Sequence, residues 1–230
     1  MSLIQPAPTG APATGSPAHR LERLKSRTRR SGEASFFYLD TLFNAPAVKV
    51  LPGEFFVTEE DLVITTTLGS CIAACLWDRD RRIGGMNHFL LPDSGRDGGS
   101  AMGPLLDSGR YGGFAMDLLI GEMVKRGATR AGMEAKVFGG GAVISGMNSI
   151  KVGELNTRFV LEYLRTERIA VVSKDVLDIH ARKVCFLPNT GKAMVKRLAS
   201  TNTQALLAQE LAASRRAAPA GTSAGSVDLF

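Results

Sequence analysis

The residues best suited to covalent chemistry lie close together in one segment, 65–89 (TTTLGSCIAACLWDRDRRIGGMNHF). This segment contains two of the three cysteines and one of the three histidines of the 230-residue chain. A cysteine thiolate is a nucleophile, and a neighbouring imidazole can take the proton of the thiol. The small residues Gly69 and Ser70 stand directly before Cys71, where they leave the backbone room to approach a substrate. Cys71 and His88 are therefore candidates for a nucleophile and its base.

These two side chains can meet only if the chain between them turns back on itself. Residues 72–77 (IAACLW) and 86–91 (MNHFLL) are short apolar runs with the composition of β-strands. We predict a hairpin closed by a two-residue turn at 79–80, and in that register Cys71 lies directly opposite His88. Opposed side chains on one face of a sheet have Cβ atoms about 4.5 to 5.5 Å apart, which brings a thiol and an imidazole within reach of each other.

Other interpretations of the same residues remain open. A bulge at the Gly-Gly pair 84–85 would shift the register by one residue and send the two side chains to opposite faces of the sheet. Cys71, Cys75 and His88 can also be read as three ligands of a metal site, although no fourth ligand is evident. A buried cysteine can equally be a small hydrophobic residue, and this is our interpretation of Cys75 and Cys185, which have apolar neighbours.

The elements that must position these residues follow from hydrophobic periodicity. Helices are predicted at 112–127 and 154–168, where apolar residues recur on one helical face. Further strands are predicted at 62–68, 135–138, 169–173, 183–187 and 193–198. The glycine run at 138–142 (FGGGA) lacks the pattern of a phosphate-binding loop, so we expect close backbone packing or a flexible loop there. The predicted fold class is α+β, with layered mixed β-sheets packed against two main helices.

The ends of the chain differ from its centre in composition. Residues 1–18 are rich in Pro, Ala, Gly, Ser and Thr, and residues 1–31 carry six Lys and Arg against one Glu, so five of the six net positive charges lie there. Such a segment buries too little apolar surface to offset the entropy lost on ordering. We therefore predict a mostly disordered basic extension at 1–49, one folded domain at 50–200, and a C-terminal helix with a flexible tail at 201–230.

Composition also limits the class of protein. An odd number of cysteines without the spacing of a disulfide framework favours a reducing compartment, and no apolar run reaches the length of a membrane span. We therefore expect a cytoplasmic protein without membrane insertion. The basic extension lacks aromatic residues that would stack on bases, and we do not expect nucleic acid as a partner.

Taken together, the motifs resemble those of the CheD family of chemoreceptor glutamine deamidases. The matching stretches are TTTLGSCIAACLWD, GGMNHFLLP, YGGFAMDLLIGEMVKRGA, AKVFGGGAVI, VGELNTRFVLEYLRTERI and TGKAMVKRL, which together span about residues 52–198. The combination of LGSC with GGMNHF at this separation is highly specific.

The resemblance implies a cysteine hydrolase with a Cys-His-Thr triad and a fold similar to the catalytic domain of the cytotoxic necrotizing factor toxins. Matched by motif, Cys71 is the nucleophile, His88 is the base, and Thr65, six residues before the cysteine, is the third member. No cofactor is implied. Spacing alone does not separate Thr65 from Thr66 and Thr67, but alternation along a strand places Thr65 and Thr67 on one face and Thr66 on the other.

The activity that the resemblance implies is hydrolysis of glutamine side-chain amides in methyl-accepting chemoreceptors, which supports adaptation in chemotaxis. Hydrolysis of receptor glutamyl methyl esters is a further activity of the same kind. The alternative is a regulatory binding protein that docks on chemoreceptors or on the CheC phosphatase. A triad by itself also leaves open cysteine peptidase or amidase activity on other substrates.

Two positions depart from the family pattern. At 153–156 the chain has Gly-Glu-Leu-Asn where the family tends to have Gly-Glu-Arg-Asn. At 177–180 it has Leu-Asp-Ile-His where the family often has a Gly-Gly. Neither departure changes the three residues matched to the triad.

Overall fold

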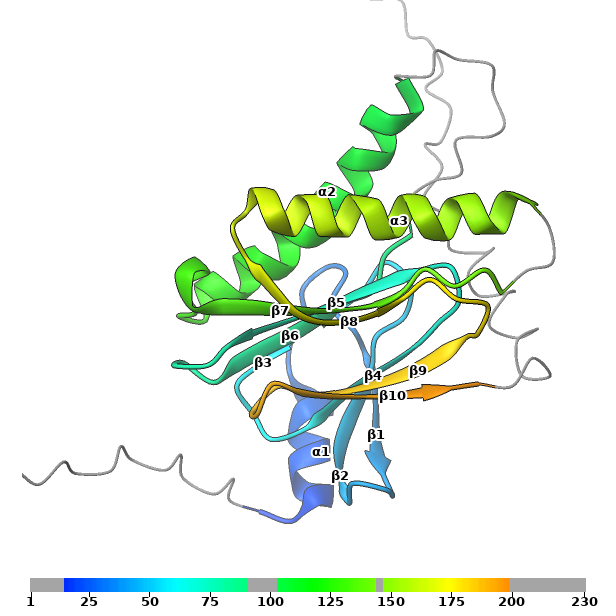
Figure 1. Cartoon of the computed structure of the whole chain (residues 1–230). Coiled ribbons are helices and arrows are strands. Elements are labelled where there is room, and N and C mark those ends of the chain that lie inside the picture. The colour runs from blue at the N-terminus through cyan, green and yellow to red at the C-terminus, as the bar shows by residue number, and fades with distance from the viewer. Residues whose placement is uncertain (1–14, 91–102, 144–146, 199–230) are drawn as a thin grey trace, which may run out of the picture.

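The computed structural model describes residues 15–90, 103–143 and 147–198, which form two five-stranded β-sheets and three α-helices (Figure 1). In chain order the elements are α1 (Pro17–Ser26), β1 (Phe36–Asp40), β2 (Ala45–Lys49), β3 (Phe55–Thr58), β4 (Val63–Leu68), β5 (Ile72–Asp78), β6 (Ile83–Asn87), α2 (Gly103–Lys125), the 3₁₀ helix η1 (Arg130–Gly132), β7 (Met133–Gly139), α3 (Met147–Thr166), β8 (Ala170–Val176), β9 (Arg182–Leu187) and β10 (Lys192–Arg197). The predicted α+β class is confirmed.

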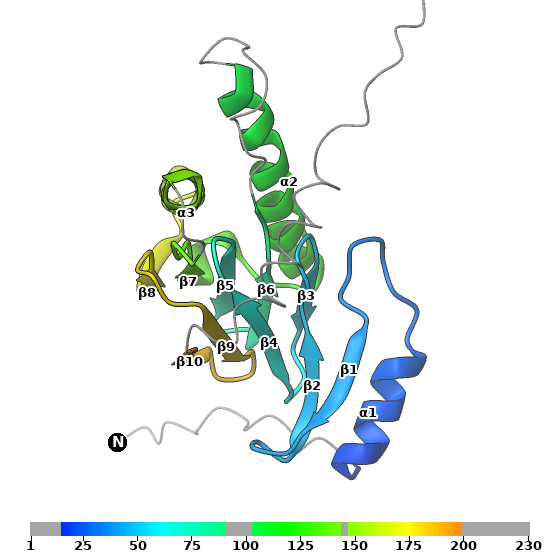
Figure 2. The same ribbon diagram turned by 90° about the vertical axis from the view of Figure 1, so that its right-hand side faces the viewer.

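The two sheets are stacked, and the two long helices lie on one of them. We call the sheet with strand order β3-β6-β5-β7-β8 sheet A and the sheet with order β1-β2-β4-β9-β10 sheet B. Each contains one parallel pair, β7 with β8 in sheet A and β2 with β4 in sheet B. Helices α2 and α3 cover the face of sheet A that points away from sheet B (Figures 1 and 2). Sheet A is therefore covered on both faces.

Alternate residues of β5 belong to the two different apolar cores that this layering creates. Ile72 and Leu76 face the helices and pack with Val160 of α3 and other residues of that core. Ala73 and Cys75 point the other way, into the core between the sheets. A strand buried on both faces reads as one continuous apolar run, which is why the segment 72–77 shows no polar alternation.

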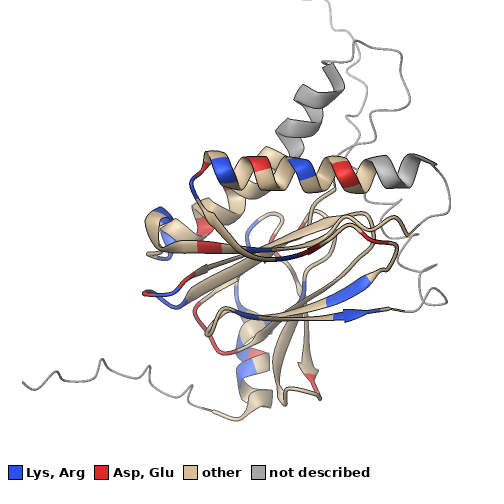
Figure 3. Cartoon of the chain, viewed as in Figure 1, with Lys and Arg blue, Asp and Glu red and all other residues tan. Residues whose placement is uncertain are grey.

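The two predicted helices are confirmed, but both begin before the first residue of the apolar pattern from which they were predicted. Helix α2 starts nine residues before the predicted 112, and α3 starts seven before the predicted 154. The predicted stop of α2 at Gly127 is confirmed, because this residue takes a positive φ of 101° beyond the last turn. Along α3, acidic and basic residues alternate on the exposed side (Figure 3).

The prediction of a mostly disordered segment at 1–49 is wrong for its described part, which contains α1, β1 and β2. Leu21 and Leu24 of α1 are buried against the core between the sheets, together with Phe37 and Val48. Figure 2 shows α1 lying beside β1. The two leucines lie on one face of the helix, and most of their neighbours in the sequence are charged. The composition of the segment therefore did not reveal this apolar face, which is stabilised by packing on other elements.

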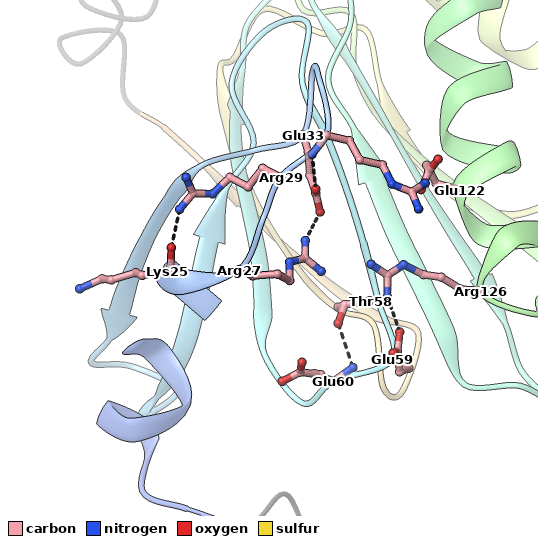
Figure 4. A network of polar contacts seen from close by, with 10 residues as sticks. Lys25, Arg27, Arg29, Glu33, Thr58, Glu59, Glu60, Glu122 and Arg126 are labelled. Carbon is pink, nitrogen blue, oxygen red and sulfur yellow. Dashed lines mark hydrogen bonds and ion pairs between the residues drawn. The ribbon is translucent and has the colours of Figure 1, made fainter. Parts of the chain in front are cut away.

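Two of the arginines that follow α1 form ion pairs within the folded unit, although Arg30 itself stays exposed. Arg27 forms an ion pair with Glu33 (Figure 4). Arg30 forms one with Glu122 of α2. The folded domain therefore begins well before the predicted boundary at residue 50.

The predicted C-terminal helix falls in 201–230, which lies outside the described residues. Within the parts of the chain that the structure describes, no helix combines the length and the apolar character needed to cross a bilayer.

Candidate active site

The predicted hairpin between Cys71 and His88 is present, but its register differs. Strands β5 and β6 pair with Cys75 opposite Met86, and the turn between them has four residues, 79–82, instead of two. The prediction that Cys71 and His88 lie directly opposite each other is therefore wrong by two residues. The bulge considered at the glycine pair is absent from this pairing, which is regular along the whole of β6 that faces β5.

A shift of two residues keeps both side chains on the same face of the sheet, because side chains alternate with a period of two. Ile72 and Phe89 exchange both backbone hydrogen bonds, each with an N–O distance of 2.9 Å. Cys71 and His88, which stand next to this pair, are thus diagonal neighbours on the side toward sheet B. The Cα atoms of such neighbours lie about 7 to 8 Å apart across the two strands, so a long side chain can bridge the distance.

Cys71 ends a three-residue turn, 69–71, that carries the chain from β4 in sheet B to β5 in sheet A. We call this segment the Cys71 turn. The carbonyl of Gly69 accepts a hydrogen bond from the N–H of Gly141 (2.7 Å), and the carbonyl of Cys71 accepts one from the N–H of Gly140 (2.8 Å). The candidate nucleophile is fully buried, with 0% of its surface exposed.

The glycine run after β7 packs directly against this turn. Of the two predicted roles, close backbone packing and a flexible loop, the first is the one observed. A Cβ atom on Gly139, which has a φ of 116°, would lie 2.0 Å from the carbonyl oxygen of Cys71. Helix α3 approaches as closely from the other side, since a Cβ on Gly153 would lie 2.3 Å from the carbonyl oxygen of Gly140. Only glycines permit this contact between loop, turn and helix.

His88 is fixed both through its backbone and through its ring. Its N–H donates to the carbonyl of Glu54 (3.0 Å), and its carbonyl accepts from the N–H of Gly53 (2.7 Å). The ring atom Nδ1 lies 2.8 Å from the hydroxyl of Thr66 and 3.4 Å from the carbonyl oxygen of Val50. The ring is therefore held in one orientation between β4 and the end of β2.

The structure brings Thr66, and not Thr65, to His88. The hydroxyl of Thr65 is hydrogen-bonded to that of Tyr38 (3.0 Å) and donates to the carbonyl of Val48 (3.4 Å), on the side of sheet B that faces away from sheet A. The prediction of Thr65 as the partner of His88 is thus wrong. Matching by motif counts residues back from the cysteine, whereas the alternation of β4 decides which hydroxyl faces the interior.

The surroundings of Nδ1 indicate which ring nitrogen carries the proton. A carbonyl oxygen only accepts hydrogen bonds, and the Thr66 hydroxyl donates to the same Val50 carbonyl at 2.7 Å. That hydroxyl therefore offers a lone pair to His88, so both neighbours of Nδ1 favour an N–H there. The basic lone pair of the neutral ring is then on Nε2.

The other two cysteines are placed as core residues, as predicted. Cys75 lies between the sheets, and burial raises the pKa of its thiol. Burial also raises the pKa of Cys185, which is opposite Thr65 on the outer side of sheet B. Neither thiol is suited to ionise at neutral pH. Among the described residues, no three or more His, Cys, Asp or Glu side chains gather as ligands of a metal ion would.

Asn156 is a site residue that the sequence interpretation missed. Its side-chain amide donates to the carbonyl of Ser70 at 2.8 Å, and the residue has no exposed surface. A signal was available, because Asn156, Val160 and Leu164 recur at intervals of four on the buried side of α3. A polar residue in such an apolar stripe needs a buried hydrogen-bond partner.

Arg182 was also missed, and it supports the glycine run from behind. Its fully buried guanidinium donates to the carbonyls of Gly139 (2.6 Å), Asp175 (2.8 Å) and Leu177. It also forms an ion pair with the Asp175 carboxylate at 3.5 Å. The loop that supports the Cys71 turn is thus itself held by a buried cation.

A buried cysteine on a turn between two sheets, with an oriented imidazole on the same face of the adjoining hairpin, is the type of site found in cysteine hydrolases. Residues 90–197 match the family model described as CheD chemotactic sensory transduction. The alignments with individual relatives extend further toward the N-terminus and include the candidate site.

Three relatives illustrate the similarity. The chain is 57% identical over 222 residues to the probable chemoreceptor glutamine deamidase CheD 1 of Albidiferax ferrireducens, which covers 94% of this chain and 89% of that protein. It is 46% identical over 197 residues to the protein named probable chemoreceptor glutamine deamidase CheD in a Janthinobacterium species (86% and 95% covered). It is 48% identical over 199 residues to the protein of the same name in Burkholderia vietnamiensis (86% and 79%). The chain belongs to the CheD family.

Proposed function

We propose that this protein hydrolyses the side-chain amides of specific glutamines in methyl-accepting chemoreceptors, giving glutamate and ammonia, and thereby supports adaptation in chemotaxis. The observation that carries the proposal is the 2.8 Å contact between Thr66 and Nδ1 of His88, on the face of the hairpin that also carries Cys71. The names of the relatives supply the substrate class. The cytoplasm is the proposed location, because a thiol nucleophile stays reduced there.

The reaction proceeds in two halves around a thioester. Nε2 of His88 takes the proton of the Cys71 thiol, and the thiolate attacks the carbon of the glutamine carboxamide. The C–N bond breaks as the imidazolium returns the proton to the departing ammonia. In the second half, His88 takes a proton from water and the resulting hydroxide attacks the thioester. The C–S bond breaks, Cys71 recovers its proton, and the glutamate side chain is released.

Thr66 is the proposed third member of the triad. Its hydroxyl accepts the Nδ1–H of His88 and keeps the basic lone pair on Nε2, where the thiol proton is transferred. The Val50 carbonyl, which receives the hydroxyl proton, fixes the direction of that acceptor. Because threonine is neutral, we assign it to orienting the ring and give it only a small part in stabilising the imidazolium.

The test is mass spectrometry of a glutamine-containing chemoreceptor cytoplasmic fragment after incubation with wild type, Cys71→Ala and Cys75→Ala. Wild type and Cys75→Ala should convert amide to acid, because Cys75 is a buried core residue with a raised pKa. Cys71→Ala should leave the amides unchanged while still binding the fragment.

Conversion by Cys71→Ala at the rate of wild type would overturn the assignment of the nucleophile. Binding of the fragment by all three proteins without conversion by any would favour the other candidate, a regulatory protein that docks on receptors or on a CheC-type phosphatase.

A further inference from the structure

The Cys71 turn presents its backbone in one fixed orientation, because all three of its carbonyls accept hydrogen bonds. Those of Gly69 and Cys71 are held by the glycine run that follows β7, and that of Ser70 is held by Asn156 of α3. The three donors are two backbone amides and one side-chain amide, and none of them carries a charge.

The direction of a carbonyl fixes the direction of the amide in the same peptide unit. In a planar trans peptide the N–H points opposite to the C=O. The Ser70 carbonyl points at Asn156, so the N–H of Cys71 points away from α3. The next amide, that of Ile72, donates to Phe89 in the ladder with the end of β6. Asn156 therefore sets the direction of the backbone N–H on the candidate nucleophile itself.

This direction matters for the tetrahedral intermediate. When the thiolate adds to a carboxamide, negative charge develops on an oxygen bonded to the same carbon as Sγ. The amide of the nucleophilic residue is covalently close to that carbon, and amides of this kind stabilise such oxyanions when they are aimed in advance. We propose that Asn156 is a positioning residue that aims the Cys71 N–H at the oxyanion. This inference rests on the function proposed above.

The burial and environment of Asn156 support this role. It has no exposed surface and occupies a stripe of α3 that is otherwise apolar, with Val160 and Leu164 following at intervals of four. A leucine there would fill the space without the cost of desolvating an amide. The close contact of Gly153 with Gly140 brings α3 near enough for a short side chain to reach the turn.

The test compares Asn156→Leu and Asn156→Asp with wild type and with Val160→Ala. Neither Asn156 variant can donate a side-chain N–H to the Ser70 carbonyl. The leucine keeps the apolar packing, and the aspartate keeps the shape of the side chain. Val160→Ala is the matched control, because it removes buried volume one turn along the same helix face. Each protein is assayed for kcat and KM on the chemoreceptor fragment and for the rate at which iodoacetamide labels Cys71.

Alkylation by iodoacetamide is the second readout, because the thiol displaces iodide from a saturated carbon and no oxyanion forms. Its rate therefore depends on the thiol and not on the alignment of an oxyanion donor. We expect kcat of both Asn156 variants to fall about 10- to 100-fold, somewhat less than for complete removal of an oxyanion donor. KM should stay within about threefold of wild type in both variants, and so should the alkylation rate of Asn156→Leu, as in the Val160→Ala control. Alkylation is judged on the neutral leucine variant, because a carboxylate at position 156 would itself repel the thiolate.

Unchanged kcat in the folded variants would overturn the proposal. So would a parallel fall in kcat and alkylation of Asn156→Leu, because Asn156 would then act on the thiol or on the fold as a whole. Failure of the proposed function appears in a different arm, as absence of deamidation by wild type while Cys71 is still alkylated, and would overturn both proposals together.

Discussion

The two ends of β5 carry turns that are held by opposite kinds of group. At its C-terminal end, the buried carboxylate of Asp78 accepts hydrogen bonds from the N–H groups of Asp80 (3.0 Å), Arg81 (3.0 Å) and Thr129 (2.8 Å). At its N-terminal end, the three carbonyls of the Cys71 turn accept hydrogen bonds from neutral amides, those of Gly140, Gly141 and the Asn156 side chain. The backbone of the turn at one end of β5 is thus fixed by a charged group, and that of the turn at the other end by uncharged groups.

The difference follows from what each turn must tolerate. Burial by itself raises the pKa of Asp78, but the hydrogen bonds from Thr129, Arg81 and Asp80 outweigh it and the pKa lies below its usual value. A charged acceptor of this kind stabilises strongly but loses its effect in acid. Beside Cys71, a carboxylate would also repel the thiolate and the oxyanion. Neutral amides fix the backbone without either disadvantage.

The largest effect is expected from Gly139→Ala at the uncharged end. The new Cβ would lie 2.0 Å from the carbonyl oxygen of Cys71, at a φ of 116° that alanine rarely adopts, so the turn must move. We expect loss of nearly all deamidation and a fall in the free energy of unfolding of more than about 3 kcal/mol. Chemical denaturation and the fragment assay measure both quantities.

Gly127→Ala is the matched control for backbone strain. It has a φ of 101° but nothing within 4 Å of the new Cβ, so it should lose only about 1 to 3 kcal/mol and keep kcat. Equal losses of activity in the two variants would show that the contact with the Cys71 turn is not what matters.

At the charged end, Asp78→Ala should lower the free energy of unfolding by about 2 to 4 kcal/mol at pH 7 and leave kcat of the folded protein within about threefold. Because the pKa in the folded state is lowered, the stabilisation is complete above the ordinary aspartate pKa of about 3.9 and is lost as the pH falls through the folded-state value. Urea denaturation of both proteins between pH 7 and pH 3 should show the difference shrinking in acid. A difference that grows in acid would refute the assignment.

A smaller effect, on rate alone, separates the two threonines of β4. Thr66→Val removes the hydrogen bond to His88 and should lower kcat about 10- to 100-fold, equivalent to about 1.4 to 2.7 kcal/mol. Thr65→Val removes the contact with Tyr38 and should change kcat less than about threefold. Rates measured on the receptor fragment decide between them. A large loss for Thr65→Val with Thr66→Val unaffected would restore the assignment made by motif.

The smallest effect is expected behind the glycine run. Leu177 has a φ of 65°, in the left-handed region that favours glycine, and its carbonyl accepts a hydrogen bond from Arg182. Leu177→Gly removes the backbone strain at this residue but raises the conformational entropy of the unfolded chain. Because the two effects oppose each other, the free energy of unfolding should rise by no more than about 1 kcal/mol, with kcat unchanged. Thermal denaturation is sufficient to measure it. A clear destabilisation would mean that the leucine side chain contributes packing that outweighs the strain.

Much of this framework could be predicted from the sequence because it depends on local pattern. The short apolar runs gave the strands, and the hairpin placed Cys71 and His88 on one face even though the register was two residues off. The four-residue turn could not be predicted, since the Asp78 carboxylate that shapes it also binds Thr129, 51 positions away. A long-range partner of this kind leaves no local signal.

The errors at the site and at the N-terminus have the same origin. Thr65 and Thr66 are equivalent by composition, and only the stacking of the sheets decides which hydroxyl meets His88. Leu21 and Leu24 are too few to mark a buried helix within a basic segment, and their partners lie in sheet B and β3. Local pattern determines elements, whereas the choice between neighbouring residues depends on tertiary contacts.

The central claim, that Cys71 and His88 act as one unit, is tested most directly by a mutant cycle of deamidation rates. Wild type, Cys71→Ala, His88→Ala and the double variant are assayed on the same chemoreceptor fragment, with binding of the fragment measured alongside. We predict that each single substitution removes nearly all of the rate above background and that the double variant is scarcely slower than either. Additive losses with binding intact would contradict the claim, because they would mean that the thiol and the imidazole contribute independently.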